Sequence, residues 1–160
     1  MKKLKQATIL LVEDDIADQK LIKQSLQNQL IANELKIAGS AEDAINYLEN
    51  SKTNDPAYPT PDLILLDLNM PGMDGKNLLK MVKADSMLDT IPVVILTTSD
   101  SDRDVIESFK LQAAGYVKKP VSLVEFQKVL ADLTDYWFVI CKQAKHNKED
   151  IYDRNFCLVN

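Results

Sequence analysis

The sequence has a single histidine and only two cysteines among its 160 residues. His146 alone cannot supply a histidine-based catalytic triad or a zinc site built from histidines, so we expect neither. Cys141 and Cys157 lie apart and have no further cysteines to form a disulfide framework. We interpret them as two ordinary reduced thiols.

The sequence also lacks long apolar runs and an excess of positive charge. No apolar run approaches the roughly 20 residues that span a bilayer. The apolar stretch after the basic start is too short for a signal peptide. The net charge is −5, whereas a protein that binds nucleic acid normally has a basic face. We therefore expect a cytoplasmic protein with no membrane or nucleic-acid partner.

Short apolar segments alternate with longer amphipathic segments, a pattern typical of an α/β domain with a parallel sheet. Three of the strands are apolar throughout, which indicates a sheet covered on both faces. We expect one domain over residues 1–143, with a core of about 7–135, and then a polar tail over 144–160. The predicted strands are 8–12, 35–38, 63–66, 93–96 and 115–117, and the predicted helices lie near 16–29, 41–51, 75–84, 102–113 and 122–143.

Five such units favour a flavodoxin-like, doubly wound fold with a five-stranded parallel sheet and an extended C-terminal helix. The strand order 2-1-3-4-5 is adopted from folds with this alternation, because the sequence does not fix it. In that order, ligands bind beyond the carboxyl ends of the strands, beside the first and third strands. The unusual polar residues of this sequence follow those strand ends.

Carboxylates directly follow two of the predicted strands. Glu13, Asp14 and Asp15 follow the first strand, and Asp67 follows the third. If these strands are neighbours, at least three carboxylates converge, and their repulsion favours a bound cation such as Mg²⁺. Such acids can also be ordinary residues at a helix N-terminus, which interact with the helix dipole. We favour that interpretation for Asp15 alone, and a metal site for the other three.

Hydroxyl and ammonium groups follow two further strands. Thr97 begins a Thr-Thr-Ser cluster after the fourth strand, and Lys119 follows the fifth. Each residue alone is unremarkable. Together with a metal ion they can neutralise the oxygens of a phosphoryl group. A carboxylate would then be the nucleophile, and Asp67 is the best placed because it stands alone after a buried strand.

In this order and spacing, the residues resemble those of response-regulator receiver domains of two-component signalling, over about residues 7–135. The resemblance implies a single-domain regulator that is not an enzyme. Such a regulator accepts a phosphoryl group from a histidine kinase or a phosphotransfer protein and signals through protein contacts. The resemblance rests on Ile9-Leu-Leu-Val-Glu-Asp14, Leu66-Asp-Leu-Asn-Met-Pro-Gly-Met-Asp-Gly75, Leu96-Thr97 and Gly115-Tyr-Val-Lys-Lys-Pro120.

The resemblance also implies a role for each matching acid. Asp67 would be the phosphoacceptor and one of the metal ligands. Glu13 and Asp14 would be the acidic pair around Mg²⁺, and the main-chain carbonyl of Asn69 would be a further ligand.

The resemblance also implies roles for three residues that respond to phosphorylation. Thr97 would be the switch hydroxyl that binds the phosphoryl group, and Lys119 would be its counter-ion, before a cis bond to Pro120. Tyr116 would be the aromatic residue that follows the shift of Thr97. Partners would bind the face formed by the predicted helix near 102–113, the strand 115–117 and the helix near 122–143.

The last predicted helix continues through Tyr136-Trp-Phe-Val-Ile-Cys141. This extension is similar to that of small stand-alone regulators that partner bacterial phytochrome kinases. It places bulky apolar groups all round the helix, and such a helix is normally buried. We therefore predict a homodimer through the extended helix near 122–143, with the strand 115–117 or the helix near 102–113 beside it. The alternative is that residues 151–159 fold back over the helix.

Two other functions are compatible with parts of this pattern. A degenerate receiver would act as an interaction module without phosphorylation, but such modules usually lack one of the acids or the lysine. A phosphatase of the haloacid-dehalogenase type also uses an aspartate nucleophile and Mg²⁺. It requires a second aspartate two residues later, where this chain has Asn69.

Overall fold

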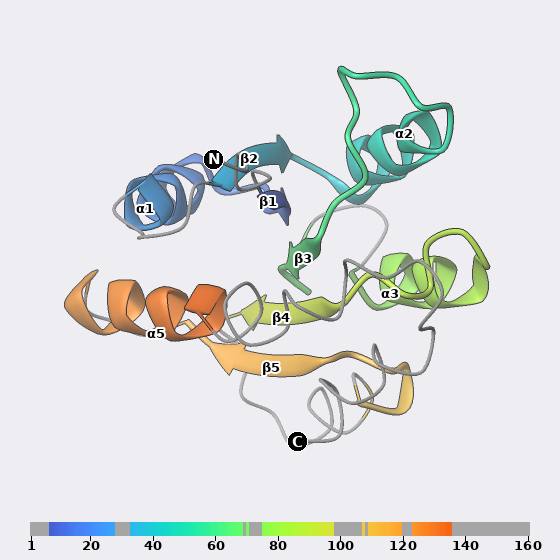
Figure 1. Ribbon diagram of the computed structural model, residues 1–160. Helices are drawn as coiled ribbons and strands as arrows, with labels where there is room; N and C mark the ends of the chain where they lie inside the picture. The colour runs from blue at the N-terminus through green and yellow to red at the C-terminus, as the bar shows by residue number, and fades with distance from the viewer. Residues whose placement is uncertain are drawn as a thin grey trace.

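The structure, a computed structural model, describes residues 7–27, 33–68, 70, 75–97, 107, 109–119 and 123–135. Strands and helices alternate along most of the described chain (Figure 1), which confirms the predicted α/β class. The elements are β1 (Ala7–Val12), α1 (Ile16–Gln27), β2 (Asn33–Ala38), α2 (Ala41–Ser51), β3 (Leu63–Leu66), α3 (Gly75–Ala84), β4 (Val93–Thr97), β5 (Gly115–Lys118) and α5 (Leu123–Asp135).

The five strands form one parallel sheet in the order β2-β1-β3-β4-β5, as predicted. The chain therefore winds outward from β1 to β2 and then returns past β1 to β3. In the β1–β3 pair, Val12 lies opposite Leu66. The next residues, Glu13 and Asp67, consequently leave two neighbouring strands at the same edge of the sheet.

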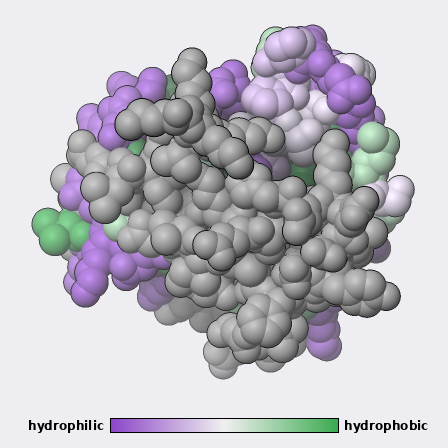
Figure 2. Space-filling model, in the orientation of Figure 1, coloured by the Kyte–Doolittle hydropathy of each residue, from purple (hydrophilic) through white to green (hydrophobic). Residues whose placement is uncertain are grey.

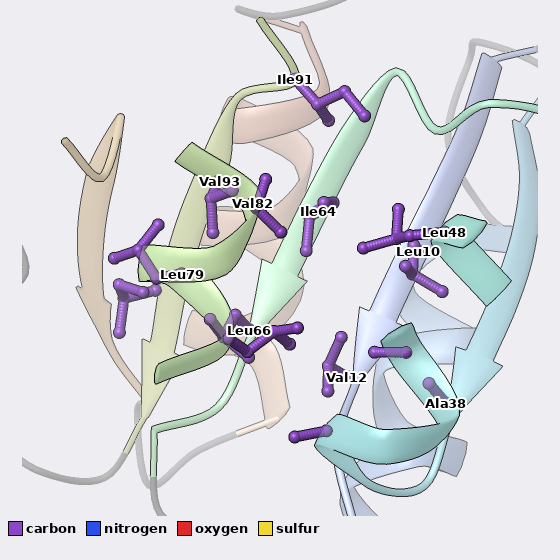
Figure 3. Packing of buried hydrophobic residues seen from close by; sticks show 14 of the residues in the cluster. Leu10, Val12, Ala38, Leu48, Ile64, Leu66, Leu79, Val82, Ile91 and Val93 are labelled. Carbon is purple, nitrogen blue, oxygen red and sulfur yellow. The ribbon is translucent and has the colours of Figure 1, made fainter. Parts of the chain in front are cut away.

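Helices cover both faces of the sheet, with α1 and α5 on one face and α2 and α3 on the other (Figure 1). Alternate residues of each strand face opposite layers, so the central strands are buried on both sides. Figure 3 shows part of the layer at α2 and α3, with Leu10 and Ile64 from the sheet, Leu48 from α2 and Val82 from α3. In the opposite layer, Leu130 of α5 is fully buried.

Hydrophilic residues dominate the described surface in the view of Figure 2, with hydrophobic residues scattered among them. The largest exposed fractions among the bulky apolar side chains belong to Val124, Ile16 and Met87. Within the described ranges, none of the helices combines the length and apolar character that crossing a bilayer requires.

One helix ends earlier than the sequence predicted. Within the predicted helix 102–113, the described residues 107, 109 and 110 are helical, but 111–112 form a turn. Gln112 has a φ of 66°, the left-handed conformation in which many helices end. The nitrogen of Ala114 then donates to the oxygen of Val93 at 2.8 Å, so the chain joins the sheet at once.

The other described boundaries agree with the predicted ones to within two residues. The last helix is described from Leu123 to Asp135. Its predicted continuation to residue 143, and the tail over 144–160, lie outside the described residues. So does residue 120, and with it the predicted cis bond.

The main chain at the start of α3 packs closely against the main chain of the residues that follow β3. A Cβ atom on Gly75 would lie 2.6 Å from the main-chain oxygen of Asp67 and 2.9 Å from the Cα of Leu68. Both neighbours are backbone atoms, which cannot rotate out of the way as a side chain can. The absence of a side chain at Gly75 therefore allows α3 to hold the segment that carries Asp67.

We expect Gly75→Ala to lower the free energy of unfolding by about 1–3 kcal/mol, because a methyl group in filled space forces the backbone apart. Gly39→Ala is the matched control. Its new Cβ would have Oδ2 of Asp43 as its nearest neighbour, at an ordinary 3.8 Å. This control should stay within about 0.5 kcal/mol of the parent. Urea denaturation followed by circular dichroism measures both variants, and equal stabilities would contradict the close approach at Gly75.

Candidate functional site

Three carboxylates meet beyond the ends of β1 and β3. One carboxylate oxygen from each of Glu13, Asp14 and Asp67 lies within 4.8 Å of the other two. Glu13 and Asp67 are only 1% and 7% exposed, whereas Asp14 is exposed. The structure therefore brings together the three acids that the sequence predicted to converge, with one of them open to solvent.

The two buried acids are held by main-chain hydrogen bonds to the neighbouring strands. The nitrogen of Glu13 donates to the oxygen of Ala38 at 3.0 Å, and the nitrogen of Asp67 donates to the oxygen of Val12 at 3.0 Å. Oε1 of Glu13 also accepts a hydrogen bond from the nitrogen of Asp15 at 3.1 Å. These bonds fix the main chain of both acids at the edge of the sheet, and one of them also orients the Glu13 carboxylate.

Lys119 brings a buried ammonium group among these acids. Its Nζ donates to Oε2 of Glu13 and, at 3.2 Å, to Oδ2 of Asp67. A further bond, 2.8 Å long, goes to Oδ2 of Asp18. The Lys119 side chain is only 8% exposed, and its main-chain nitrogen donates to the oxygen of Thr97 at 2.7 Å. The lysine after β5 thus reaches across the sheet edge to the carboxylates after β1 and β3.

The buried charges shift one another's protonation. Burial raises the pKa of Glu13 to about 7, an effect that Lys119 opposes and the charge of Asp67 reinforces. Burial acts to lower the pKa of Lys119, but its hydrogen bonds to Asp18 and Glu13 outweigh this, and the pKa is raised. Lys119 therefore carries its positive charge, yet the acids around it outnumber it. This imbalance favours a second cation in the site.

The donor set suits a hard divalent ion. Glu13, Asp14 and Asp67 offer carboxylate oxygens, the ligands that Mg²⁺ and similar ions prefer. Mg²⁺ usually takes one or two carboxylates and keeps several waters, and the exposure of Asp14 leaves the cluster open to solvent. The residues present therefore fit the ion that the sequence predicted.

The other predicted site residues are only partly described. Thr97 is the last residue of β4 and is fully buried. Tyr116 lies on β5 opposite Ile95, is half-buried, and packs against the core layer at α2 and α3. Asn69, whose carbonyl was predicted as a metal ligand, lies outside the described residues, so its role stays a prediction.

Asp15 directly precedes α1 and does not belong to the acid cluster. Its Oδ1 accepts a hydrogen bond from the nitrogen of Asp18 at 3.0 Å, and its main-chain oxygen accepts one from the nitrogen of Gln19 at 2.9 Å. This is the bonding of a helix N-cap. The interpretation of Asp15 as an ordinary residue of a helix N-terminus is confirmed.

Sequence reasoning missed two residues of α1 that touch the site. Asp18 contacts Lys119, and Nε2 of Gln19 donates to the main-chain oxygen of Glu13 at 2.7 Å. A signal was available for Asp18, because it lies four residues after Asp14, at the spacing of helix neighbours. The contact itself joins positions 101 residues apart, and nothing local in the sequence indicates it.

The sequence is similar to those of known proteins. The model of the response regulator receiver domain family matches residues 9–131. Response regulator Rcp1 from Synechocystis sp. is 38% identical over 129 residues, which are 81% of this chain and 87% of that protein. The probable methanogenesis regulatory protein FilR2 from Methanothrix harundinacea is 31% identical over 129 residues, 81% of this chain and 82% of that protein.

Two solved structures are similar in fold and sequence. The phosphorylated cyanobacterial phytochrome response regulator RcpA has a TM-score of 0.78 and 34% identity, covering 85% of this chain and 96% of that chain. The Mn²⁺-bound form of Rcp1 has a TM-score of 0.73 and 37% identity, covering 82% and 94%. Both are named as response regulators, and one of the two structures is a Mn²⁺-bound form. The chain therefore belongs to the response regulator receiver domain family of two-component signalling.

Proposed function

We propose that this chain is a phosphorylation-dependent switch in which Asp67 accepts a phosphoryl group from a phosphohistidine. The main support is the 3.2 Å contact between Oδ2 of Asp67 and Nζ of Lys119, beside the carboxylates of Glu13 and Asp14. A carboxylate oxygen of Asp67 attacks phosphorus while the phosphorus–nitrogen bond of the donor breaks. The bonding pair goes to the imidazole, which takes up a proton, and Asp67 becomes an acyl phosphate.

The acid cluster serves this reaction by holding Mg²⁺. Glu13, Asp14 and Asp67 would bind the ion, with the main-chain carbonyl of Asn69 as a further ligand. Bound Mg²⁺ would neutralise negative charge on the phosphoryl oxygens. A metal-bound form of the relative Rcp1 and the oxygen-only donor set of this chain support the assignment.

Lys119 and Thr97 are proposed to bind the transferred group. Lys119 already carries a positive charge next to Asp67, so one of its hydrogen bonds can pass from the carboxylate to a phosphoryl oxygen. Thr97 ends β4, one strand from Asp67, and its hydroxyl would donate to a second oxygen. Both groups would stabilise charge that develops during transfer.

The switch would then act through β5. Thr97 lies opposite Lys118 in the β4–β5 pair, and Tyr116 lies opposite Ile95 in the same pair. By the resemblance to receiver domains, Tyr116 would follow a shift of Thr97 toward the phosphoryl group. Partners would bind the changed face formed by the helix predicted over 102–113, β5 and α5, so the output would be a protein contact and not a reaction of the chain itself.

The proposed donor is a sensor histidine kinase of the phytochrome type, or a phosphotransfer protein. One similar structure is named as a cyanobacterial phytochrome response regulator, and the relative Rcp1 is a response regulator of similar length. We assign residues 1–143 to one receiver domain and 144–160 to a tail, and we place the protein in the cytoplasm.

Two alternatives are less well supported. A degenerate receiver would not need Glu13, Asp14, Asp67 and Lys119 together, and here all four side chains converge. A phosphatase of the haloacid-dehalogenase type would need an aspartate at position 69, where the chain has asparagine.

Asp67→Asn should abolish phosphoryl acceptance, because an amide is not a nucleophile at neutral pH. Incubation with acetyl phosphate and Mg²⁺, followed by intact mass, should show one added phosphoryl group on the parent and none on the variant. Asp43→Asn, at an exposed acid in the first turn of α2, should be phosphorylated like the parent. A phosphoryl group on the Asp67→Asn chain would assign the acceptor to another residue.

Asp14→Ala should weaken Mg²⁺ binding by more than about tenfold, because even outer-shell groups at metal sites have effects of that size. Titration calorimetry measures the dissociation constant directly and does not depend on the fluorescence of Trp137. Asp43→Ala removes the same charge outside the acid cluster and should change the constant less than twofold. If Asp14→Ala binds Mg²⁺ as tightly as the parent, the metal assignment is wrong.

The proposed homodimer uses apolar residues of the extended helix 5, which lie outside the described residues. Aromatic-rich apolar patches of this kind commonly mark interfaces. Sedimentation equilibrium should show a dimeric parent at high micromolar concentration, with Trp137→Ala weaker and Val139→Glu monomeric. Met87→Glu, at a 61% exposed side chain after α3, should leave the dimer intact. A parent that stays monomeric, phosphorylated or not, would refute the dimer.

A further inference from the structure

Lys119 has one partner that neither the acid cluster nor the proposed reaction uses. The cluster that fits a cation consists of Glu13, Asp14 and Asp67. Two of these acids also accept hydrogen bonds from Lys119, so a bound cation and the ammonium group share them. The third partner, Asp18, stands outside the cluster and contacts Lys119 at 2.8 Å.

The first turn of α1 places Asp18 firmly at this point. Its main-chain nitrogen donates to Oδ1 of Asp15, the helix N-cap, at 3.0 Å. The next residue, Gln19, is tied through its side chain to the main-chain oxygen of Glu13 at 2.7 Å. Hydrogen bonds of Asp18 and of its neighbour therefore hold this turn in place, and the carboxylate of Asp18 contacts Lys119. Helix α1, which carries Asp18, covers the same face of the sheet as α5 (Figure 1).

The ammonium group has three N–H donors, and three carboxylates accept from it. A divalent cation at the acid cluster would bind the carboxylates of Glu13 and Asp67, from which Lys119 also draws two of its hydrogen bonds, and would repel the ammonium. The hydrogen bond to Asp18 does not face that competition. The side chain of Asp18 is 36% exposed, whereas that of Lys119 is 8% exposed. Asp18 therefore lies on the solvent side of the site, at its mouth.

We propose that Asp18 is a positioning residue for Lys119, which retains the ammonium group at the mouth of the site when Glu13 and Asp67 bind a cation. This inference deepens the proposed function and rests on it. By holding part of the ammonium charge, Asp18 limits the competition between Lys119 and Mg²⁺ for the shared carboxylates. It also keeps Lys119 within reach of the incoming phosphoryl group.

Asp18 could instead act only as a negative charge at the start of a helix, where acids interact favourably with the dipole. The two roles differ in their dependence on Lys119. A residue that acts through Lys119 loses its effect once that side chain is removed, whereas a general charge effect persists. A double-mutant cycle measures this difference.

The cycle consists of the parent, Asp18→Asn, Lys119→Met and the double variant, with Mg²⁺ affinity measured by calorimetry. We expect Asp18→Asn to weaken Mg²⁺ binding about fivefold in the parent and less than twofold in the Lys119→Met background. Asp43→Asn is the matched control for one charge lost from the first turn of a helix, and it should have no effect in either background. An equal weakening in both backgrounds, or none in the parent, overturns the proposal.

A second measurement connects the proposal to the reaction. At saturating Mg²⁺, Asp18→Asn should accept a phosphoryl group from acetyl phosphate about tenfold more slowly than the parent. A change of this size is expected when one hydrogen bond between charged groups is weakened. Asp18→Glu keeps the charge and should recover most of the rate. An unchanged rate for Asp18→Asn overturns the positioning role. If the parent itself gains no phosphoryl group, the proposed function is refuted. The double-mutant cycle of Mg²⁺ affinities would still show whether Asp18 acts through Lys119.

Discussion

Lys119 shares one ammonium group among Glu13, Asp18 and Asp67, and the rest of the site depends on these ion pairs. Two carboxylates buried side by side are unfavourable without a compensating charge, because burial and mutual repulsion both favour their neutral forms. The three acids come from the end of β1, the first turn of α1 and the end of β3. One side chain after β5 therefore joins segments that are remote in the sequence.

The hydrogen-bond ladder of the parallel sheet brings that side chain to its partners. The carboxyl ends of parallel strands emerge at one edge, so residues just beyond β1, β3 and β5 meet there. Each is tied to a neighbouring strand by its own main chain, Asp67 to Val12 and Lys119 to Thr97. The close approach of Gly75 to Asp67 adds a contact from the α3 side. Backbone geometry thus sets most of the distances in the site.

The sequence was most informative where residue type and periodicity carry the signal. Apolar strands and the acids and lysine that follow them were predicted at their observed positions, because burial and strand ends leave local patterns. The end of the helix before β5 was missed because Gln112, and not glycine, adopts the left-handed conformation there. Asp18 was missed because its partner lies far along the chain. Such contacts depend on how α1 is oriented on the sheet, and composition does not encode that orientation.

If Asp67 accepts a phosphoryl group as proposed, the same ion pairs would link that change to β5. On the proposed function, a phosphoryl group adds negative charge beside an ammonium whose three donors are already in use. Lys119 must then redistribute its hydrogen bonds, and it directly follows β5, which carries Tyr116 on the core layer at α2 and α3. If Asp18 holds the ammonium from the α1 side, the redistribution is confined to the bonds with Glu13 and Asp67. The main chain of Lys119 follows β5 and is bonded to Thr97 of β4, so a movement of its side chain would act on these two strands.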